Sequence, residues 1–117
     1  MNKRERGSHY EALAAKFLKE RGYEILERNY RCRMGEIDII CKDDKYLVFV
    51  EVKYRSGSGQ GGAFMAVDHK KQHRISRVAA YYLLEHQMDE GTPCRFDVVA
   101  VRGDAVQLVK NAFEYSG

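Results

Sequence analysis

Residues 35–53, GEIDIICKDDKYLVFVEVK, decide the fold of this chain. Two runs in and just beyond this stretch, 36–41 and 46–54, are rich in β-branched and aromatic residues. The polar residues 42–45 between them are typical of a turn. The stretch therefore predicts two antiparallel strands joined as a hairpin.

The register of this hairpin follows from where the turn is centred. A turn centred between residues 43 and 44 makes Asp38 face Phe49 and places Glu51 diagonally from Asp38, with Cβ atoms about 7 Å apart. Side chains alternate between the two faces along each strand. One predicted face is mixed and carries Glu36, Asp38, Ile40, Leu47, Phe49, Glu51 and Lys53. The other is wholly apolar, is predicted to be core, and carries Ile37, Ile39, Cys41, Tyr46, Val48, Val50 and Val52.

The rest of the chain supplies helices and further strands. Apolar residues at helical spacing predict helices over 8–21 and 67–87. Strands are predicted over 23–30, 94–102 and 105–110. The element order is α-β-β-β-α-β-β, so the sequence predicts an α/β fold with a mixed sheet of about five strands flanked by helices.

The composition fits one globular domain spanning residues 1–117. The longest purely apolar run, residues 46–50, is far shorter than the roughly 20 residues of a membrane helix, and no apolar segment of a signal peptide follows the charged start. The three cysteines, Cys32, Cys41 and Cys94, form no C-x-x-C pair. We therefore expect reduced thiols and a cytoplasmic protein.

Charge is unevenly distributed along the chain, although the net charge is only +3. Residues 34–52 contain five acidic and two basic residues, and the blocks on either side, 1–33 and 53–81, are basic. Cationic surface around carboxylates suits a metal-dependent enzyme that acts on a polyanion. Solvated helix faces beside an acidic hairpin explain the same pattern, so charge leaves both interpretations open.

The mixed face of the hairpin holds the candidate catalytic residues Asp38, Glu51 and Lys53. Two carboxylates at this separation can hold one Mg²⁺ (or Mn²⁺), and the lysine can orient a water or neutralise charge in a transition state. The alternative is a solvated face with an exposed Glu51–Lys53 ion pair. Glu11 falls within the apolar arc of helix 8–21, either as a further metal ligand over the hairpin or as a helix-edge residue that reaches water.

Helix 67–87 has a basic face opposite its apolar one. Such a stripe can follow a phosphate backbone, or it can simply be solvated. Lys71 and Gln72, at the edges of the apolar arc, are weaker candidates for reaching the carboxylates. Asp97 either supports the site or, more simply, forms an ion pair with a helix arginine. The candidate nucleic-acid-binding residues are Arg31, Arg33, Arg55, Lys70, Arg74 and Arg77.

Several motifs together resemble the YraN family of small bacterial proteins. They are GEIDII at 35–40 and VFVEVK at 48–53, with shorter matches at residues 10–18, 66–71, 95–99 and 111–113. That family is similar to the restriction-endonuclease-like, PD-(D/E)-x-K superfamily, whose nearer relatives include archaeal Holliday-junction resolvases. The resemblance implies a three-layer, restriction-endonuclease-like domain.

The resemblance also implies roles for individual residues. Asp38, Glu51 and Lys53 fall on the catalytic motif, and Glu11 falls on the helix-borne acid. Metal ligands would be Asp38, Glu51 and Glu11, with Lys53 assisting. Two positions depart from the family pattern, since Ile37 replaces a proline and Tyr10 stands where many relatives have glycine, but neither departure removes a ligand.

Two functions follow as expectations. The first is a Mg²⁺-dependent (or Mn²⁺-dependent) endonuclease that hydrolyses phosphodiester bonds in DNA, with branched or flap structures as candidate substrates and DNA favoured over RNA. The alternative is a non-catalytic nucleic-acid-binding protein that keeps the nuclease fold. An interaction module unrelated to nucleic acid would show no salt-dependent DNA affinity. Junction-cutting relatives act as dimers, so a homodimer is possible.

Overall fold

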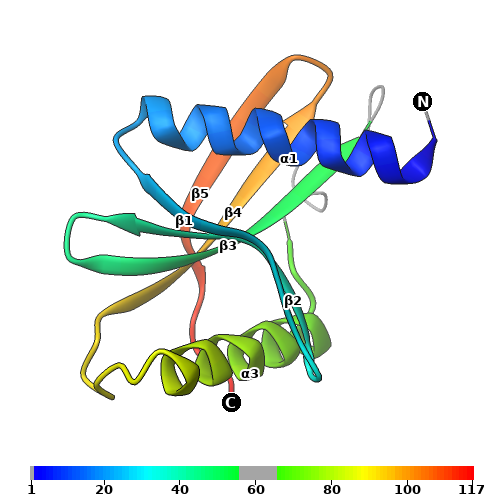
Figure 1. Ribbon diagram of the computed structural model, residues 1–117. Helices are drawn as coiled ribbons and strands as arrows, with labels where there is room; N and C mark the ends of the chain where they lie inside the picture. Colours follow the sequence, from blue (N-terminus) through cyan, green and yellow to red (C-terminus); the bar gives the residue numbers. More distant parts are fainter. Residues whose placement is uncertain (1, 56–65) are drawn as a thin grey trace.

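The computed structural model describes residues 2–55 and 66–117, which form two helices and one mixed sheet of five strands (Figure 1). The glycine- and serine-rich sequence of residues 56–62 predicts a flexible loop, and this segment lies outside the described residues. The sheet order is β1-β2-β3-β4-β5, with β3 and β4 parallel and the other neighbours antiparallel. The elements are α1 (Lys3–Glu20), β1 (Glu24–Cys32), β2 (Gly35–Asp43), β3 (Tyr46–Arg55), α3 (His69–Glu85), β4 (Cys94–Arg102) and β5 (Ala105–Phe113).

The two helices cover opposite faces of the sheet, which gives three layers (Figure 1). Under α1, the small residues Ala14 and Ala15 and the buried Leu18 pack on alternate residues of the central strands. Under α3, Ile75, Val78 and other apolar residues pack on the opposite face. The predicted α/β fold, its element order and both apolar helix faces are confirmed. Among the described residues, no helix is long and apolar enough to cross a bilayer.

The largest differences from the predicted bounds are at the start of α1 and at the end of β5. Helix α1 begins at Lys3 rather than at residue 8, because Asn2 caps it by accepting a hydrogen bond of 2.8 Å from the backbone N–H of Glu5. Strand β5 continues to Phe113 rather than ending at residue 110. Its extension pairs Phe113 with Phe96, and the two rings stack with centroids 5.0 Å apart. Packing across the sheet therefore lengthens this strand beyond its local signal.

The hairpin register is two residues away from the predicted one. Asp43 pairs with Tyr46 and Ile39 pairs with Val50, so the two-residue turn is formed by residues 44 and 45 rather than 43 and 44. Asp44 adopts the left-handed conformation, with φ of 56°, which tight hairpin turns require and which aspartate tolerates. A shift of two residues keeps the side chains of the paired residues, 39–43 and 46–50, on their predicted faces. The same register, continued one residue past the paired segment, points Asp38 at Glu51 instead of placing it diagonally.

Strand β2 breaks the predicted alternation near Asp38. Its pairing with β3 begins at Ile39, and the part before that residue pairs with β1 alone. Ile37 consequently packs in the cluster under α3, whereas Ile39 packs in the cluster under α1. The prediction that both residues share one apolar face is wrong for Ile37. The β1–β2 hairpin bends toward α3 in this region (Figure 1).

Candidate active site

Asp38 lies where β2 separates from β3, and its carboxylate takes the place of a backbone carbonyl as the acceptor for a β3 N–H group. Oδ2 of Asp38 accepts a hydrogen bond of 2.7 Å from the backbone N–H of Val52. Val52 stands between Glu51 and Lys53, so this bond fixes Asp38 against the two other residues of the predicted motif. Glu51 is buried, with only 8% of the residue exposed. The structure thus brings the predicted carboxylate pair together on adjacent strands.

The two carboxyl groups influence each other strongly. Burial raises the pKa of Asp38 to about 8, and the hydrogen bond and negative charge of Glu51 act in the same direction. The hydrogen bond from Val52 opposes this shift because it favours the ionised form. Without a metal, the site therefore disfavours the ionised form of Asp38 beside Glu51. Such a pair suits a cation that can replace the proton.

Two lysines complete the charge balance of this site. The ammonium of Lys71, in the first turn of α3, forms an ion pair with Oε2 of Glu51. The ammonium of Lys53 donates to the backbone carbonyl of Ala66. Burial lowers the pKa of Lys53, and the positive charge of Lys71 lowers it further. Gln72, the other weak candidate, does not reach the carboxylates and instead donates to the carbonyl of Val67 at 2.7 Å.

Glu11 approaches the same site from the opposite layer. Its Oε1 atom is buried and has no hydrogen-bond partner among the described residues. Burial raises the pKa of Glu11, and the negative charge of Glu11 in turn raises that of Asp38. A buried carboxylate oxygen without a partner costs free energy unless a cation or donor joins it. Glu11 is therefore within electrostatic range of the pair, and its role as a ligand stays a prediction.

Asn29 is a residue of this site that sequence reasoning missed. It lies opposite Asp38 in the β1–β2 ladder, between the pairs Arg28–Ile39 and Tyr30–Ile37. Its φ is 55°, a left-handed conformation that is unusual inside a strand. Its side chain interacts with Glu11 and partly offsets the raised pKa of that group. An asparagine in a strand-like run was the available signal, because asparagine is depleted in strands.

The donor set fits a hard divalent cation in chemistry, since all three candidates offer carboxylate oxygens. Nevertheless, residues 2–55 and 66–117 contain no group of three or more His, Cys, Asp or Glu side chains already gathered to hold a metal ion. Asp38 and Glu51 are in contact, and Glu11 does not complete a three-carboxylate cluster with them. The site therefore offers a metal ion two neighbouring carboxylates, Asp38 and Glu51, and a third, Glu11, within electrostatic range.

The predicted nucleic-acid-binding residues lie on exposed surface, and two of them are tied to the fold. Arg31 pairs with Glu36 at 3.0 Å, with both side chains at least half exposed. Arg74, on α3, lies over Gly35 at the start of β2, where an added Cβ would meet its Cδ at 3.0 Å. This contact joins the basic face of α3 to the β1–β2 turn. The remaining predicted residues are also exposed and are Arg33, Arg55, Lys70 and Arg77.

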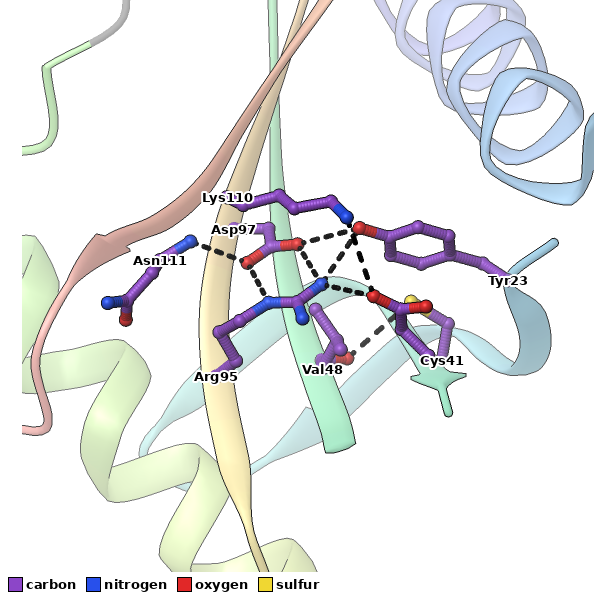
Figure 2. Close-up of polar contacts among 8 residues, drawn as sticks. Tyr23, Cys41, Val48, Arg95, Asp97, Lys110 and Asn111 are labelled. Atoms are coloured by element: carbon purple, nitrogen blue, oxygen red, sulfur yellow. Dashed lines mark hydrogen bonds and ion pairs between the residues drawn. The ribbon is translucent and has the colours of Figure 1, made fainter. Parts of the chain in front are cut away.

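Asp97 belongs to a separate structural network rather than to the carboxylate site (Figure 2). It is fully buried and ion-paired with Arg95 at 2.9 Å. Tyr23 and the backbone N–H of Asn111 also donate to it, and Arg95 extends to Asp43 at 2.9 Å. The predicted ion pair is confirmed, but its arginine lies on strand β4 instead of a helix.

Comparison with known proteins shows extensive similarity. The family model described as uncharacterised protein family UPF0102 matches residues 10–101. A UPF0102 protein of Lachnoclostridium phytofermentans is 51% identical over 117 residues, which cover all of this chain and 99% of the relative. One from Aeromonas hydrophila is 47% identical and covers 92% of this chain and 84% of its own. One from Nitrosomonas europaea is 44% identical and covers 95% of each chain.

Proposed function

The chain belongs to the uncharacterised protein family UPF0102, the YraN family that its motifs resemble, and we propose that it is a metal-dependent nuclease that hydrolyses phosphodiester bonds in DNA. The observation that supports this most is the pair of neighbouring carboxyl groups, Asp38 and Glu51. The Val52 N–H binds Asp38 next to Glu51, and Lys53 lies two residues beyond Glu51. Family membership by itself assigns no activity.

Asp38 and Glu51 would hold one Mg²⁺ or Mn²⁺, with Glu11 as the further carboxylate. When bound, the ion would lower the pKa of a water molecule and offset charge on the scissile phosphate. Lys53 carries a positive charge beside Glu51 in a partly buried position. There it would orient the attacking water or stabilise the transition state, where a desolvated cation acts more strongly than in bulk water.

The exposed basic residues support a polyanionic substrate. Arg33 lies on the β1–β2 turn, and Arg74 and Arg77 lie on α3, the helix that also carries Lys71. Backbone phosphates are the groups that such a surface binds without regard to sequence. The resemblance to junction resolvases extends the proposal to branched or flap DNA and to a homodimer.

A second function is favoured by one specific observation. The Lys71 ammonium already neutralises Glu51, and the described residues hold no gathered three-ligand cluster. A protein that binds nucleic acid and keeps the nuclease fold without turnover would have the same features. This alternative predicts salt-dependent DNA binding and no cleavage in any metal.

A labelled substrate panel separates these functions. Single strands, duplexes, flaps and four-way junctions of DNA, with an RNA duplex, are incubated with Mg²⁺, Mn²⁺ or EDTA. Wild type, Asp38→Asn and Lys53→Ala are compared with Glu36→Gln, an exposed acid on the same strand. The nuclease proposal expects metal-dependent cutting that is lost in the first two variants and kept in the control. Tight binding with no cutting by wild type would favour the binding protein.

A further inference from the structure

Lys71 neutralises a carboxylate that the metal would need. Glu51 keeps 9% of its side chain exposed, whereas Lys71 keeps 45% of its own exposed and reaches inward from the surface. The backbone of Lys71 is fixed separately, because Asp68 caps α3 by accepting a hydrogen bond of 2.8 Å from the Lys71 N–H. The ammonium can therefore leave Glu51 by side-chain rotation alone, with the helix unchanged.

From this ion pair we propose that Lys71 is an internal counter-ion, which neutralises Glu51 in the metal-free protein and is displaced when a divalent cation binds. The inference rests on the proposed metal-binding function. A buried carboxylate is costly without a partner, so the ion pair stabilises the empty site. A divalent ion that approaches Glu51 meets the repulsion of the ammonium and must separate the pair. Metal affinity is thus set partly by a residue that is not itself a ligand.

Lys53 does not have the same role. Its ammonium donates to the Ala66 carbonyl, whereas that of Lys71 contacts Glu51 directly. Removal of Lys53 would leave the Glu51–Lys71 pair in place, whereas removal of Lys71 leaves Glu51 without its ion-pair partner. The two lysines therefore have separable effects, and metal affinity distinguishes them without any measurement of cleavage.

The test is Mn²⁺ binding, measured by isothermal titration calorimetry together with thermal melting in EDTA and in Mn²⁺. The variants are Lys71→Gln, Lys71→Arg and, as a control in the opposite layer, Lys16→Gln, whose lysine is exposed on α1. We expect Lys71→Gln to melt below wild type in EDTA, to bind Mn²⁺ about tenfold more tightly, and to gain more melting temperature from Mn²⁺ than wild type does. Lys71→Arg and Lys16→Gln should resemble wild type.

The outcomes separate the two proposals. Mn²⁺ affinity in Lys71→Gln that equals or falls below that of wild type overturns the counter-ion role and leaves the nuclease proposal standing. Failure of wild type and Lys71→Gln alike to bind Mn²⁺, with both folded by their melting curves, overturns the metal-dependent function itself. Loss of binding in Glu51→Gln supports the assignment of Glu51 as the ligand that Lys71 releases.

Discussion

Asp38 accepts a hydrogen bond of 2.7 Å from the backbone N–H of Val52, the residue between Glu51 and Lys53. This bond replaces a rung of the β2–β3 ladder at the point where the strands separate. It turns a sequence motif spread over 16 residues into one local arrangement. The predictions below follow from this arrangement and from the contacts around it.

The first prediction concerns pH. The folded-state pKa of Asp38 is raised to about 8 from an ordinary value of 3.8, so the folded protein holds a proton that the unfolded chain releases above about pH 4. The free energy of unfolding must then fall as pH rises from about 4 to 8. Asp38→Asn lacks this proton but keeps an acceptor for the Val52 N–H. In EDTA at pH 8.5 we expect the free energy of unfolding of Asp38→Asn to exceed that of wild type by at least about 2 kcal/mol.

Urea unfolding at pH 5 and pH 8.5 measures this difference. The stability advantage of Asp38→Asn should grow between the two pH values, whereas Glu36→Gln, whose side chain is half exposed, should follow wild type. A constant difference between Asp38→Asn and wild type would show that Asp38 is ionised throughout.

The second prediction concerns Asn29, whose φ of 55° is strained for most side chains. Asn29→Gly removes the strain and should unfold like wild type to within a few tenths of a kcal/mol, whereas Asn29→Ala should lose about 1 kcal/mol. Both lose the interaction with Glu11. If Glu11 serves the reaction, both should cut DNA several-fold more slowly. Unchanged cleavage in both variants would remove Asn29 from the site.

The third prediction concerns Gly35, which has φ of +146° and lies under Arg74. Gly35→Ala imposes an unfavourable backbone conformation and a Cβ contact of 3.0 Å with Arg74, so we expect a loss of about 2 kcal/mol. Adding Arg74→Ala should recover only the stability lost through the steric contact, and not the stability lost through the backbone conformation. A double-mutant cycle in urea measures the coupling, and strict additivity would show that the arginine simply moves aside.

The fourth prediction concerns DNA affinity. Arg33→Ala and Arg77→Ala should each weaken binding in EDTA and reduce the slope of log affinity against log salt by about 1. Lys16 and Lys19 lie on α1, in the opposite layer, and their alanine variants should keep the wild-type slope. Fluorescence anisotropy over a salt series gives these slopes. Equal losses of DNA affinity in the arginine variants and in the α1 lysine variants would mean that DNA does not bind on the α3 side.

The fifth prediction concerns the Asp97 network. Arg95→Met leaves a fully buried carboxylate without its cation and should lower the free energy of unfolding by about 3 kcal/mol. The exposed Lys42→Met on β2 should change it little. Mn²⁺ affinity of folded Arg95→Met should match wild type. A changed affinity would connect this network to the carboxylate site.

Much of this arrangement was predictable because strand periodicity survives small errors of register. Alternation predicted that Asp38 and Glu51 lie close together, and a register error of two residues did not separate them. The error arose because Asp43 and Asp44 look alike as turn residues, and only the tertiary structure decides which of them adopts a left-handed φ.

Other features depend on contacts that no local pattern encodes. The bend at Asp38, which moves Ile37 to the cluster under α3, arises from pairing with two different strands. The Lys71–Glu51 ion pair joins a helix to a strand and depends on how the α3 layer sits on the sheet. For the same reason, the partner of Asp97 was expected on a helix and lies on its own strand.

The most direct test of the central claim is the single-turnover cleavage rate of a labelled branched DNA in Mg²⁺, for wild type, Asp38→Asn and Glu36→Gln. The account predicts cutting by wild type that EDTA abolishes, a loss of at least about 100-fold in Asp38→Asn, and a near wild-type rate in Glu36→Gln. Cutting that survives in Asp38→Asn would show that the activity comes from elsewhere. No metal-dependent cutting by folded, DNA-bound wild type would contradict the nuclease assignment.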